Sequence, residues 1–212
     1  MLPRFGEVCG CIVCVPLAGI LAIVFGILGL NNANKDAQRS GKGMAIAGIT
    51  LGGVGILFSG LLMISILLPA LNRARETANR IKCASNERQI GMAIVLYTTD
   101  HNGPFPPDLG TLAVEEDVSP NVFICPSGNT PAPPSNMTPD QLKQWVNNNS
   151  DYEYAGANLT RASDPANMVL YERDSSHGGD GMNILFADDH VEFFRMVDAQ
   201  NKIARYKSGV GP

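Results

Sequence analysis

The chain has 212 residues, of which 17% are charged and 45% are hydrophobic, and its formal net charge is −4 at pH 7. That length is enough for one modest domain with appendages. No basic patch or stripe is evident, so the charge argues against a nucleic-acid partner. These averages conceal two parts: residues 1–72 hold nearly all the long aliphatic runs, whereas residues 73–212 have the composition of an ordinary soluble domain.

Two uncharged apolar runs predict transmembrane helices, the first over about residues 9–30 and the second over about residues 44–68. A helix of about 20 apolar residues crosses a hydrocarbon core of about 30 Å, and both runs are long enough. The alternative is a pair of buried core helices, but the remaining chain is too short to enclose them. A cleaved signal peptide is disfavoured, because the first run is too long and no small-residue cleavage site precedes a soluble segment.

Small residues recur at four-residue intervals on both runs, namely Ala18, Ala22 and Gly26 on the first and Gly48 and Gly52 on the second. Such stripes let helix backbones approach closely in lipid, where packing drives association. Glycine is also simply common in membrane helices, which is the alternative explanation. We expect the two spans to pack as a hairpin.

The charges beside the spans give opposing signals about topology. The connector between the spans carries Lys35, Arg39 and Lys42 against Asp36. Short basic loops stay in the cytoplasm, which would place both termini outside. Five basic residues after the second span favour the reverse: Arg73, Arg75, Arg80, Lys82 and Arg88. We favour an extracytoplasmic domain over residues 73–212, because of a cysteine pair and a family resemblance given below.

The segment Ala70–Tyr97 has a helix-forming composition, so we expect the second span to continue as one long helix. Pro69 should kink this helix or restart it at the membrane interface. Gly91 weakens a helix by about 1 kcal/mol relative to alanine. The turn residues Asp100–Pro104 should end it.

The rest of the chain predicts a short helix and a small sheet. Thr138 is suited to be the N-cap of a helix that has Pro139 in its first turn. Three apolar segments are typical of strands: Met168–Tyr171, Met182–Ala187 and His190–Phe194. The predicted fold class is therefore α+β, with a two-helix transmembrane hairpin whose second span continues into a long helix packed on a small antiparallel sheet.

Asp188 and Asp189 separate the last two predicted strands as a two-residue hairpin connection. Aspartate tolerates the left-handed backbone region less well than glycine. Asp189 should therefore lower the stability of the fold by about 1 kcal/mol, or the turn should be of a different type.

Cys83 and Cys125 are the only cysteines after residue 72. In an extracytoplasmic domain they could form one disulfide, which would stabilise the fold by about 3–4 kcal/mol. The alternative is two separate buried thiols. The remaining three cysteines, Cys9, Cys11 and Cys14, are interpreted as apolar residues near the lipid interface, because no second Cys or His pair accompanies Cys11-x-x-Cys14 as a metal site would require.

Histidines and carboxylates gather near the last two strands: His177, Asp180, Asp188, Asp189 and His190. Such groups could bind a divalent ion. We prefer a polar loop and hairpin turn, with His190 and Glu192 facing out and Val191 and Phe193 facing in. No Ser-His-acid order or Gly-rich phosphate loop is evident, so we predict no catalytic residue, no cofactor and no metal.

Two separate resemblances to known families divide the chain. Pro16–Leu30, PLAGILAIVFGILGL, and Gly41–Gly52, GKGMAIAGITLG, resemble the two helices of a bacterial membrane domain of unknown function. That resemblance covers about residues 15–68 and implies no activity.

The second resemblance is to type II secretion pseudopilins in their prepilin-like forms, over about residues 60–195. It rests on Leu67–Glu76, LLPALNRARE, on Phe123–Ser127, FICPS, and on the run HGGDGMNILFADDHVEF over His177–Phe193. The last run is similar to the closing His-x9-Asp-Gly signature of those proteins. The resemblance implies a pilin-like fold and a secretion-related, pilus-related or structural role in the envelope. Its signature residues His177, Asp188 and Asp189 have no assigned role.

The chain departs from the pseudopilin pattern at both ends. No acidic residue lies between Asp36 and Glu76, whereas pilin-like assembly uses a glutamate near the start of the mature helix. This departure puts leader cleavage and pilus-type polymerisation in doubt. In the closing signature, ten residues separate His177 from Asp188, and Asp189 stands where glycine is expected.

Together these features predict a non-catalytic envelope protein with two spans and an extracytoplasmic pseudopilin-like domain. Its expected partners are the lipid bilayer and other envelope or pseudopilin-like proteins. The alternative is an extracytoplasmic metal-binding module or enzyme that uses His177, Asp188 and His190.

Overall fold

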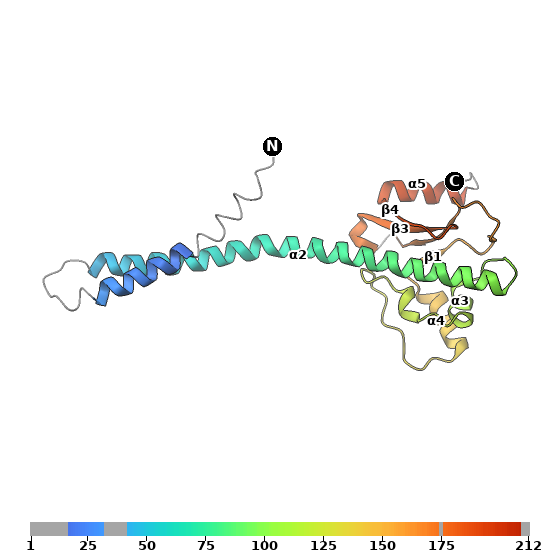
Figure 1. Cartoon of the computed structure of the whole chain (residues 1–212), viewed down its shortest axis with the longest axis horizontal. Coiled ribbons are helices and arrows are strands. Elements are labelled where there is room, and N and C mark those ends of the chain that lie inside the picture. Colours follow the sequence, from blue (N-terminus) through green and yellow to red (C-terminus); the bar gives the residue numbers. More distant parts are fainter. Residues whose placement is uncertain (1–16, 32–41, 174–175, 209–212) are drawn as a thin grey trace. The chain divides into compact units, whose positions relative to one another are not determined.

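The computed structural model describes residues 17–31, 42–173 and 176–208. The chain forms two compact units, Met1–Arg73 and Ala74–Pro212, which we call the N-terminal and C-terminal units. Helix α2 (Lys42–Asp100) begins in the first unit and ends in the second (Figure 1).

In the N-terminal unit, a helix over Leu17–Asn31 packs against the first part of α2 through small residues. A Cβ added to Gly52 would lie 2.9 Å from the Gly19 carbonyl oxygen, and one added to Gly26 would lie 3.0 Å from that of Ala45. A Cβ on Gly48 would lie 3.7 Å from the Ala22 carbonyl oxygen. The predicted close packing of the two apolar helices is therefore confirmed.

Among the described residues, only α2 is long and apolar enough to cross a membrane, and Leu17–Asn31 is a shorter apolar helix. One candidate membrane helix is therefore found, and the first of the two predicted spans stays a prediction. The predicted start of the first span, with Cys9, Cys11 and Cys14, lies outside the described residues, as do Lys35, Asp36 and Arg39 of the connector.

Helix α2 continues without a break through Pro69. Of the kink or restart expected at this proline, the restart is excluded, and the expected single long helix is confirmed. The helix ends as predicted, because Asn102 and Gly103 adopt positive φ angles of 59° and 114°. The Gly103 N–H donates to the carbonyl of Thr98 at 2.8 Å, which satisfies one of the last free carbonyls of the helix.

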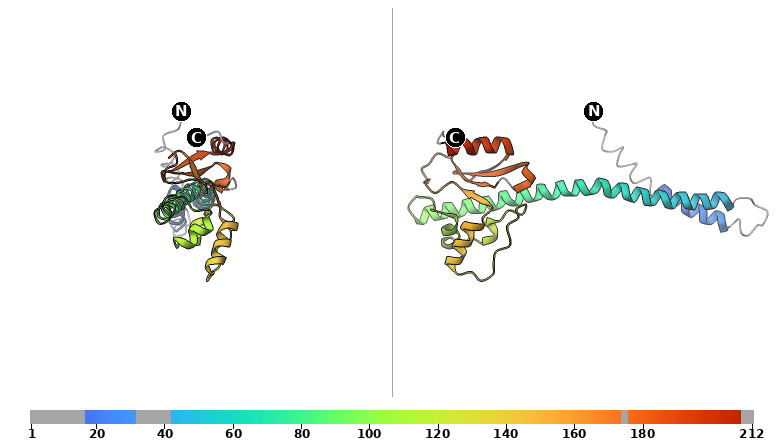
Figure 2. Two further views of the ribbon diagram at one scale, coloured as in Figure 1. Left: turned by 90° about the vertical axis from the view of Figure 1, so that its right-hand side faces the viewer. Right: turned by 180° about the vertical axis from the view of Figure 1, so that it is seen from behind.

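The C-terminal unit contains one antiparallel sheet with the strand order β1-β2-β3-β4 (Figures 1 and 2). Its strands are β1 (Tyr152–Tyr154), β2 (Met168–Glu172), β3 (Gly181–Phe186) and β4 (Val191–Arg195). The predicted antiparallel sheet and its last three strands are confirmed to within a residue at most ends, whereas β1 was not predicted.

The β3–β4 hairpin has a three-residue loop, which corrects the predicted two-residue connection. The Phe186 N–H donates to the His190 carbonyl at 3.0 Å, so the loop is Ala187, Asp188 and Asp189. Asp189 has φ 68°, and a left-handed third residue is typical of three-residue hairpins. Of the two expectations for Asp189, an energetic cost or a different type of turn, the structure thus shows the different turn.

Shorter helices complete the unit: α3 (Leu109–Glu115), η1 (Pro120–Phe123), α4 (Pro139–Asn149), η2 (Ser176–Gly179) and α5 (Met196–Lys207). Thr138 and Gln141 form a reciprocal capping box at the start of α4, so the predicted N-cap is confirmed. Asp108 caps α3 by accepting a hydrogen bond from the Thr111 N–H.

The sheet is buried on both faces. One face packs on the C-terminal part of α2, with α3 and α4 beyond it, and α5 covers the other face (Figures 1 and 2). A bulge between Met168 and Leu170 turns both Val169 and Leu170 toward the α2 side. The core therefore has two layers, and α2 is the central element of the thicker one.

The expected orientation of β4 is only partly correct. Val191 packs in the core on the α2 side, and His190 is exposed, as expected. Phe193 remains 37% exposed, because it lies under the Arg80 guanidinium at 4.8 Å rather than inside the core. Phe194 instead supplies the β4 aromatic ring that packs on the α5 side.

Candidate functional site

Helix α2 carries a row of polar side chains just before its apolar core face. Glu76, Arg80, Cys83 and Glu87 follow one another at three- and four-residue steps, so they lie on one side of the helix. Cys83 and Glu87 are completely buried. The next turns bury Ile90 and the residues after it, so the same face changes from polar to apolar. The polar part is the base of a cluster that we take as the candidate functional site.

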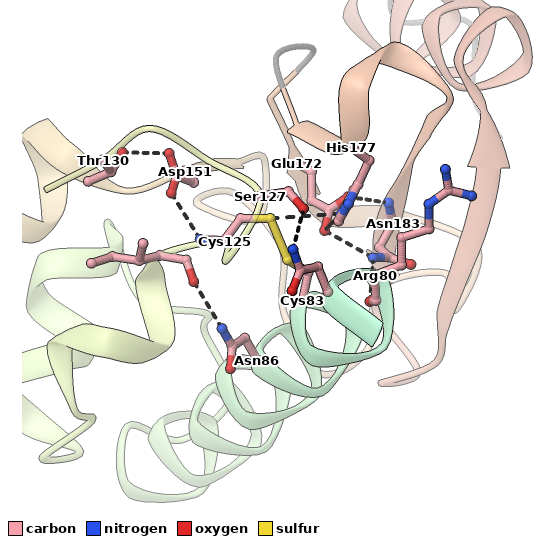
Figure 3. Close-up of a disulfide and its surroundings, with 12 residues drawn as sticks. Arg80, Cys83, Asn86, Cys125, Ser127, Thr130, Asp151, Glu172, His177 and Asn183 are labelled. Carbon is pink, nitrogen blue, oxygen red and sulfur yellow. Dashed lines mark hydrogen bonds and ion pairs between the residues drawn. A yellow bond between two sulfur atoms is a disulfide. The ribbon is translucent and has the colours of Figure 1, made fainter. Parts of the chain in front are cut away.

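A disulfide between Cys83 and Cys125 joins α2 to the segment after η1 (Figure 3). The Cys125 N–H donates to Asp151 Oδ2 at 2.9 Å, and Thr130 donates to the other oxygen of the same carboxylate at 2.6 Å. Asn86 donates to the Ile124 carbonyl at 3.0 Å. The backbone around Cys125 is therefore fixed from both sides.

His177 is the centre of the cluster and is 1% exposed. Its Nδ1 lies 2.5 Å from Glu76 Oε1, and its Nε2 lies 3.0 Å from Glu172 Oε1. The same Nε2 is 3.8 Å from the Sγ of Cys125 (Figure 3). His177 adopts a left-handed backbone with φ 55°, which is uncommon for a residue with a side chain and is held here by these contacts.

Glu172 ends β2 with a fully buried carboxylate. Its Oε2 accepts a hydrogen bond from the Asn183 N–H at 2.7 Å, and its Oε1 accepts one from the Asn183 side chain at 2.9 Å. A buried carboxylate is tolerated when several donors and a cation satisfy it. Asn183 and His177 supply those partners from β3 and η2.

The charge of His177 depends on two opposing effects. Burial disfavours its charged form, but the hydrogen bonds and negative charges of Glu172 and Glu76 raise the pKa of His177 above its ordinary value. The two ring nitrogens of His177 contact one carboxylate each, so the side chain bridges Glu76 and Glu172. Such an arrangement holds three elements together: α2, β2 and η2.

Glu87 is completely buried and lacks a hydrogen-bond partner for either carboxylate oxygen among the described residues. Burial, followed by repulsion from Glu172, raises the pKa of Glu87 well above its usual range. The buried Tyr152 hydroxyl also lacks a partner there. Burial therefore favours the neutral forms of both side chains at this end of the cluster.

At the rim of the cluster, side chains satisfy Glu76 and Asp180. The Ser127 hydroxyl donates to Glu76 Oε2 at 2.9 Å, and Arg80 Nη2 lies 2.5 Å from Asp180 Oδ2. The Asp180 side chain is thus paired with α2, and its backbone N–H donates to the His177 carbonyl at 3.3 Å.

The structure does not bring together the three residues of the predicted alternative site. His177 lies near Gly181, which pairs with Arg195, whereas Asp188 and His190 lie in the loop beyond the opposite end of the same strands. Asp188 and His190 hydrogen-bond to each other in an exposed loop, where the His190 ring stacks on Phe186. A site combining these three residues is incompatible with this geometry.

Sequence reasoning missed Glu76, Glu172, Asn183 and Glu87 as members of the cluster. Glu87 carried a usable signal, because a carboxylate on the same helical face as Cys83 and Ile90 must be buried if they are. Glu172 and Asn183 gave no such signal. Their contact depends on the β2–β3 register, and a sequence pattern does not fix that register.

Four donor atoms of this cluster have metal-ligand chemistry. One atom each from Cys83, Cys125, Glu172 and His177 lies within 4.8 Å of the others, and all four residues are buried. We therefore regard this group as the part of the described chain best suited to chemistry.

Comparison with known proteins identifies one domain. Residues 7–62 match a family described as a domain of unknown function, DUF4190. No curated protein and no solved structure matches the chain. The N-terminal part of the chain is thus similar to a domain of unknown function, as the first resemblance predicted, and the pseudopilin resemblance of the C-terminal unit stays a prediction.

Proposed function

We propose that this chain is a non-catalytic, membrane-anchored envelope protein that presents a disulfide-bonded, pseudopilin-like domain outside the cytoplasm. The observation that carries the proposal is the continuity of α2. One helix of 59 residues supplies both the apolar segment of the N-terminal unit and the central helix of the C-terminal unit.

The apolar part of α2 supports membrane anchoring. Its aliphatic side chains are largely exposed, for example Leu57 at 78% and Leu61 at 65%. A surface of this kind is unfavourable in water and favourable in a hydrocarbon core. In the proposed state, lipid covers α2 over about residues 44–68, which is the second predicted span, and the first predicted span, over about residues 9–30, crosses the same bilayer.

The disulfide supports an extracytoplasmic C-terminal unit. Disulfides persist in oxidising compartments and are rare in the cytoplasm. The Cys83–Cys125 bridge joins the helical stem to the rest of the domain. This location agrees with the basic connector between the two apolar helices.

The pilin-like role is supported by the arrangement in the C-terminal unit, where a long helix packs on a small antiparallel meander. The apolar part of α2 contains no acidic residue that could pair with a neighbouring subunit. We therefore propose a structural role in an envelope or secretion assembly that does not require pilus-type polymerisation.

Topology labelling tests this proposal. Cys9, Cys11 and Cys14 are replaced by serine, and one cysteine is introduced at either Ala162 or Ala37. A membrane-impermeant maleimide is then added to intact cells, while the native disulfide protects Cys83 and Cys125. We expect labelling of Ala162→Cys without permeabilisation, and of Ala37→Cys only after it. The reverse pattern would overturn the proposal.

A further inference from the structure

The four donors of the buried cluster are arranged almost as a tetrahedral metal site requires. His177 Nε2 is 3.0 Å from Glu172 Oε1 and 3.8 Å from Cys125 Sγ. With zinc–ligand bonds of about 2.0–2.3 Å, the ligand atoms of a tetrahedral site lie about 3.3–3.8 Å apart. All four donors lie within 4.8 Å of one another, and the two sulfur atoms can move apart to ligand spacing once the bond between them is broken.

The surroundings of the ligands also match a metal site. A histidine that binds a metal usually gives its other ring N–H to a carboxylate, which fixes the ring and its tautomer. Here Nδ1 of His177 bonds to Glu76, which leaves Nε2 facing the sulfur atoms and Glu172. Asn183 holds Glu172 in the same way. These outer contacts are already formed in the disulfide state.

The donor set selects the kind of ion. Two thiolates, one imidazole and one carboxylate suit zinc and similar transition metals, whereas calcium and magnesium prefer oxygen ligands. The disulfide, however, ties up both sulfur donors. We propose that Cys83, Cys125, His177 and Glu172 form a redox-gated zinc site, which is closed by the disulfide and opens when the disulfide is reduced.

The opening step requires an external dithiol as reductant. The dithiol gives two electrons and two protons to the Cys83–Cys125 bond and leaves as its own disulfide. Zn²⁺ then binds as both new thiols release their protons and His177 gives up any proton on Nε2. A surface cavity of about 340 Å³ is lined by Asn86, Cys125 and Thr130, so Cys125 is the bridge residue next to the surface from which the dithiol and Zn²⁺ would approach.

Metal titration of the full chain in detergent micelles tests this proposal. Cys9, Cys11 and Cys14 are replaced by serine, so that only Cys83 and Cys125 can supply thiols. One sample is reduced, freed of reductant without oxygen and equilibrated with Zn²⁺, and a second sample stays oxidised. We expect one Zn²⁺ per reduced chain and none per oxidised chain. No stoichiometric Zn²⁺ on the reduced chain, or equal binding by both samples, would overturn the proposal.

Two further measurements distinguish this site from zinc bound by loose thiols. Co²⁺ in place of Zn²⁺ should show thiolate charge-transfer bands and the intense visible bands of a tetrahedral ion. Zn²⁺ should also raise the unfolding temperature of the reduced chain, because only the folded state assembles the four ligands. Octahedral cobalt spectra or an unchanged unfolding temperature would contradict the assignment.

Single variants then assign the ligands. Glu76→Gln should weaken zinc binding about 10- to 100-fold, as expected for an outer partner of a histidine ligand. His177→Ala should weaken it by at least as much. The matched control is His190→Ala, which removes an exposed histidine away from the cluster and should leave the affinity unchanged. Equal affinity of the parent and the folded His177→Ala variant would exclude His177 as a ligand. Should that variant fail to fold, the comparison of reduced and oxidised parent still decides the proposal.

Discussion

Gly91 of α2 lies directly under the side chain of Asp189 in the β3–β4 hairpin. A Cβ added to Gly91 would overlap Asp189 Oδ1 and would lie 3.2 Å from Leu185 Cδ1. Asp189 Oδ1 is buried at this contact and lacks a hydrogen-bond partner among the described residues. Gly91 lowers the intrinsic helix propensity of α2, but a residue without a side chain is needed at this position because the β3–β4 hairpin crosses the helix there.

Gly91→Ala tests this relationship. Alanine favours a helix by about 1 kcal/mol over glycine, but we expect the variant to be less stable by about 1–3 kcal/mol, because the added methyl group overpacks the crossing. Denaturant unfolding measures the change. In an Asp189→Gly background the same substitution should become stabilising, and equal effects in both backgrounds would exclude the coupling.

Asp189→Gly should by itself stabilise the protein by about 1 kcal/mol. Asp189 has φ 68°, which is strained for a residue with a side chain, and glycine removes that strain. The substitution also removes the buried carboxyl oxygen that lacks a partner among the described residues. The matched control is Asp188→Gly, which removes the hydrogen bond to His190 and should not stabilise. A lower unfolding midpoint for Asp189→Gly would contradict this interpretation of the turn.

Loss of the disulfide should be costly. Cys83 and Cys125 are 42 residues apart, and closing a loop of that length stabilises a fold by about 4 kcal/mol. We expect Cys83→Ser/Cys125→Ser to lose about that amount in denaturant unfolding with a chelator present. An unchanged midpoint would mean that the bridge contributes nothing to stability.

Glu87 should give the protein an unusual pH dependence. Burial raises the pKa of Glu87 in the folded state, so the stability that this group contributes is full below its unfolded pKa. That stability is lost as the pH rises through the folded pKa. Every tenfold increase in the proton affinity of Glu87 on folding corresponds to about 1.4 kcal/mol of stability lost at high pH.

Glu87→Gln removes this titration while keeping the size of the side chain. We therefore expect the variant to be more stable than the parent near neutral pH, with the difference vanishing as the pH falls below about 4. Unfolding midpoints measured across that pH range provide the test. Glu192→Gln, at an exposed position of β4, is the control for the same change of charge. A variant that loses stability at neutral pH would show that the Glu87 carboxylate is favourable in the fold.

The glycines of α2 in the N-terminal unit provide a matched pair for testing helix packing. Leucine at Gly52 would collide with the Gly19 carbonyl and Ile23, whereas Gly53 has open space around it. A Cβ on Gly29 would lie 3.5 Å from the Ala45 Cβ, which suits a disulfide. Cysteines introduced at Gly29 and Ala45, with Cys9, Cys11 and Cys14 replaced by serine, should therefore cross-link on oxidation. We expect Gly52→Leu to abolish the cross-link and Gly53→Leu to leave it intact, with a gel-shift maleimide as readout. Equal cross-linking would refute the close approach.

The elements with local signals could be predicted from the sequence. Local residue types were enough for three features: the cap at Thr138, the turn residues after Asp100 and the apolar runs of β2 to β4. Helix α5, Met196–Lys207, was not predicted. It buries only Ala199 and Ile203, so its sequence shows too narrow an apolar stripe to indicate an amphipathic helix. Strand β1 has three residues and exists mainly because β2 pairs with it.

The candidate site was predictable only in part, because some of its residues are brought together by strand register and not by a local sequence pattern. Cys83, Cys125 and His177 were recognisable as unusual residue types in the sequence. Their partners were not, because glutamate and asparagine at Glu172 and Asn183 resemble ordinary exposed strand residues. Only the β2–β3 register, with its bulge before Leu170, places the Asn183 side chain against Glu172, whose carboxylate contacts the histidine.

The two edge strands of the sheet, β1 and β4, affect the solubility of the domain. An unpaired strand edge invites pairing with the edge of another sheet, which leads to aggregation. Here β1 offers only three residues at one edge, and β4 carries Glu192 and Arg195 at the other. Short or charged edges resist such pairing, so high local concentrations on a membrane surface should not drive these domains into β-aggregates.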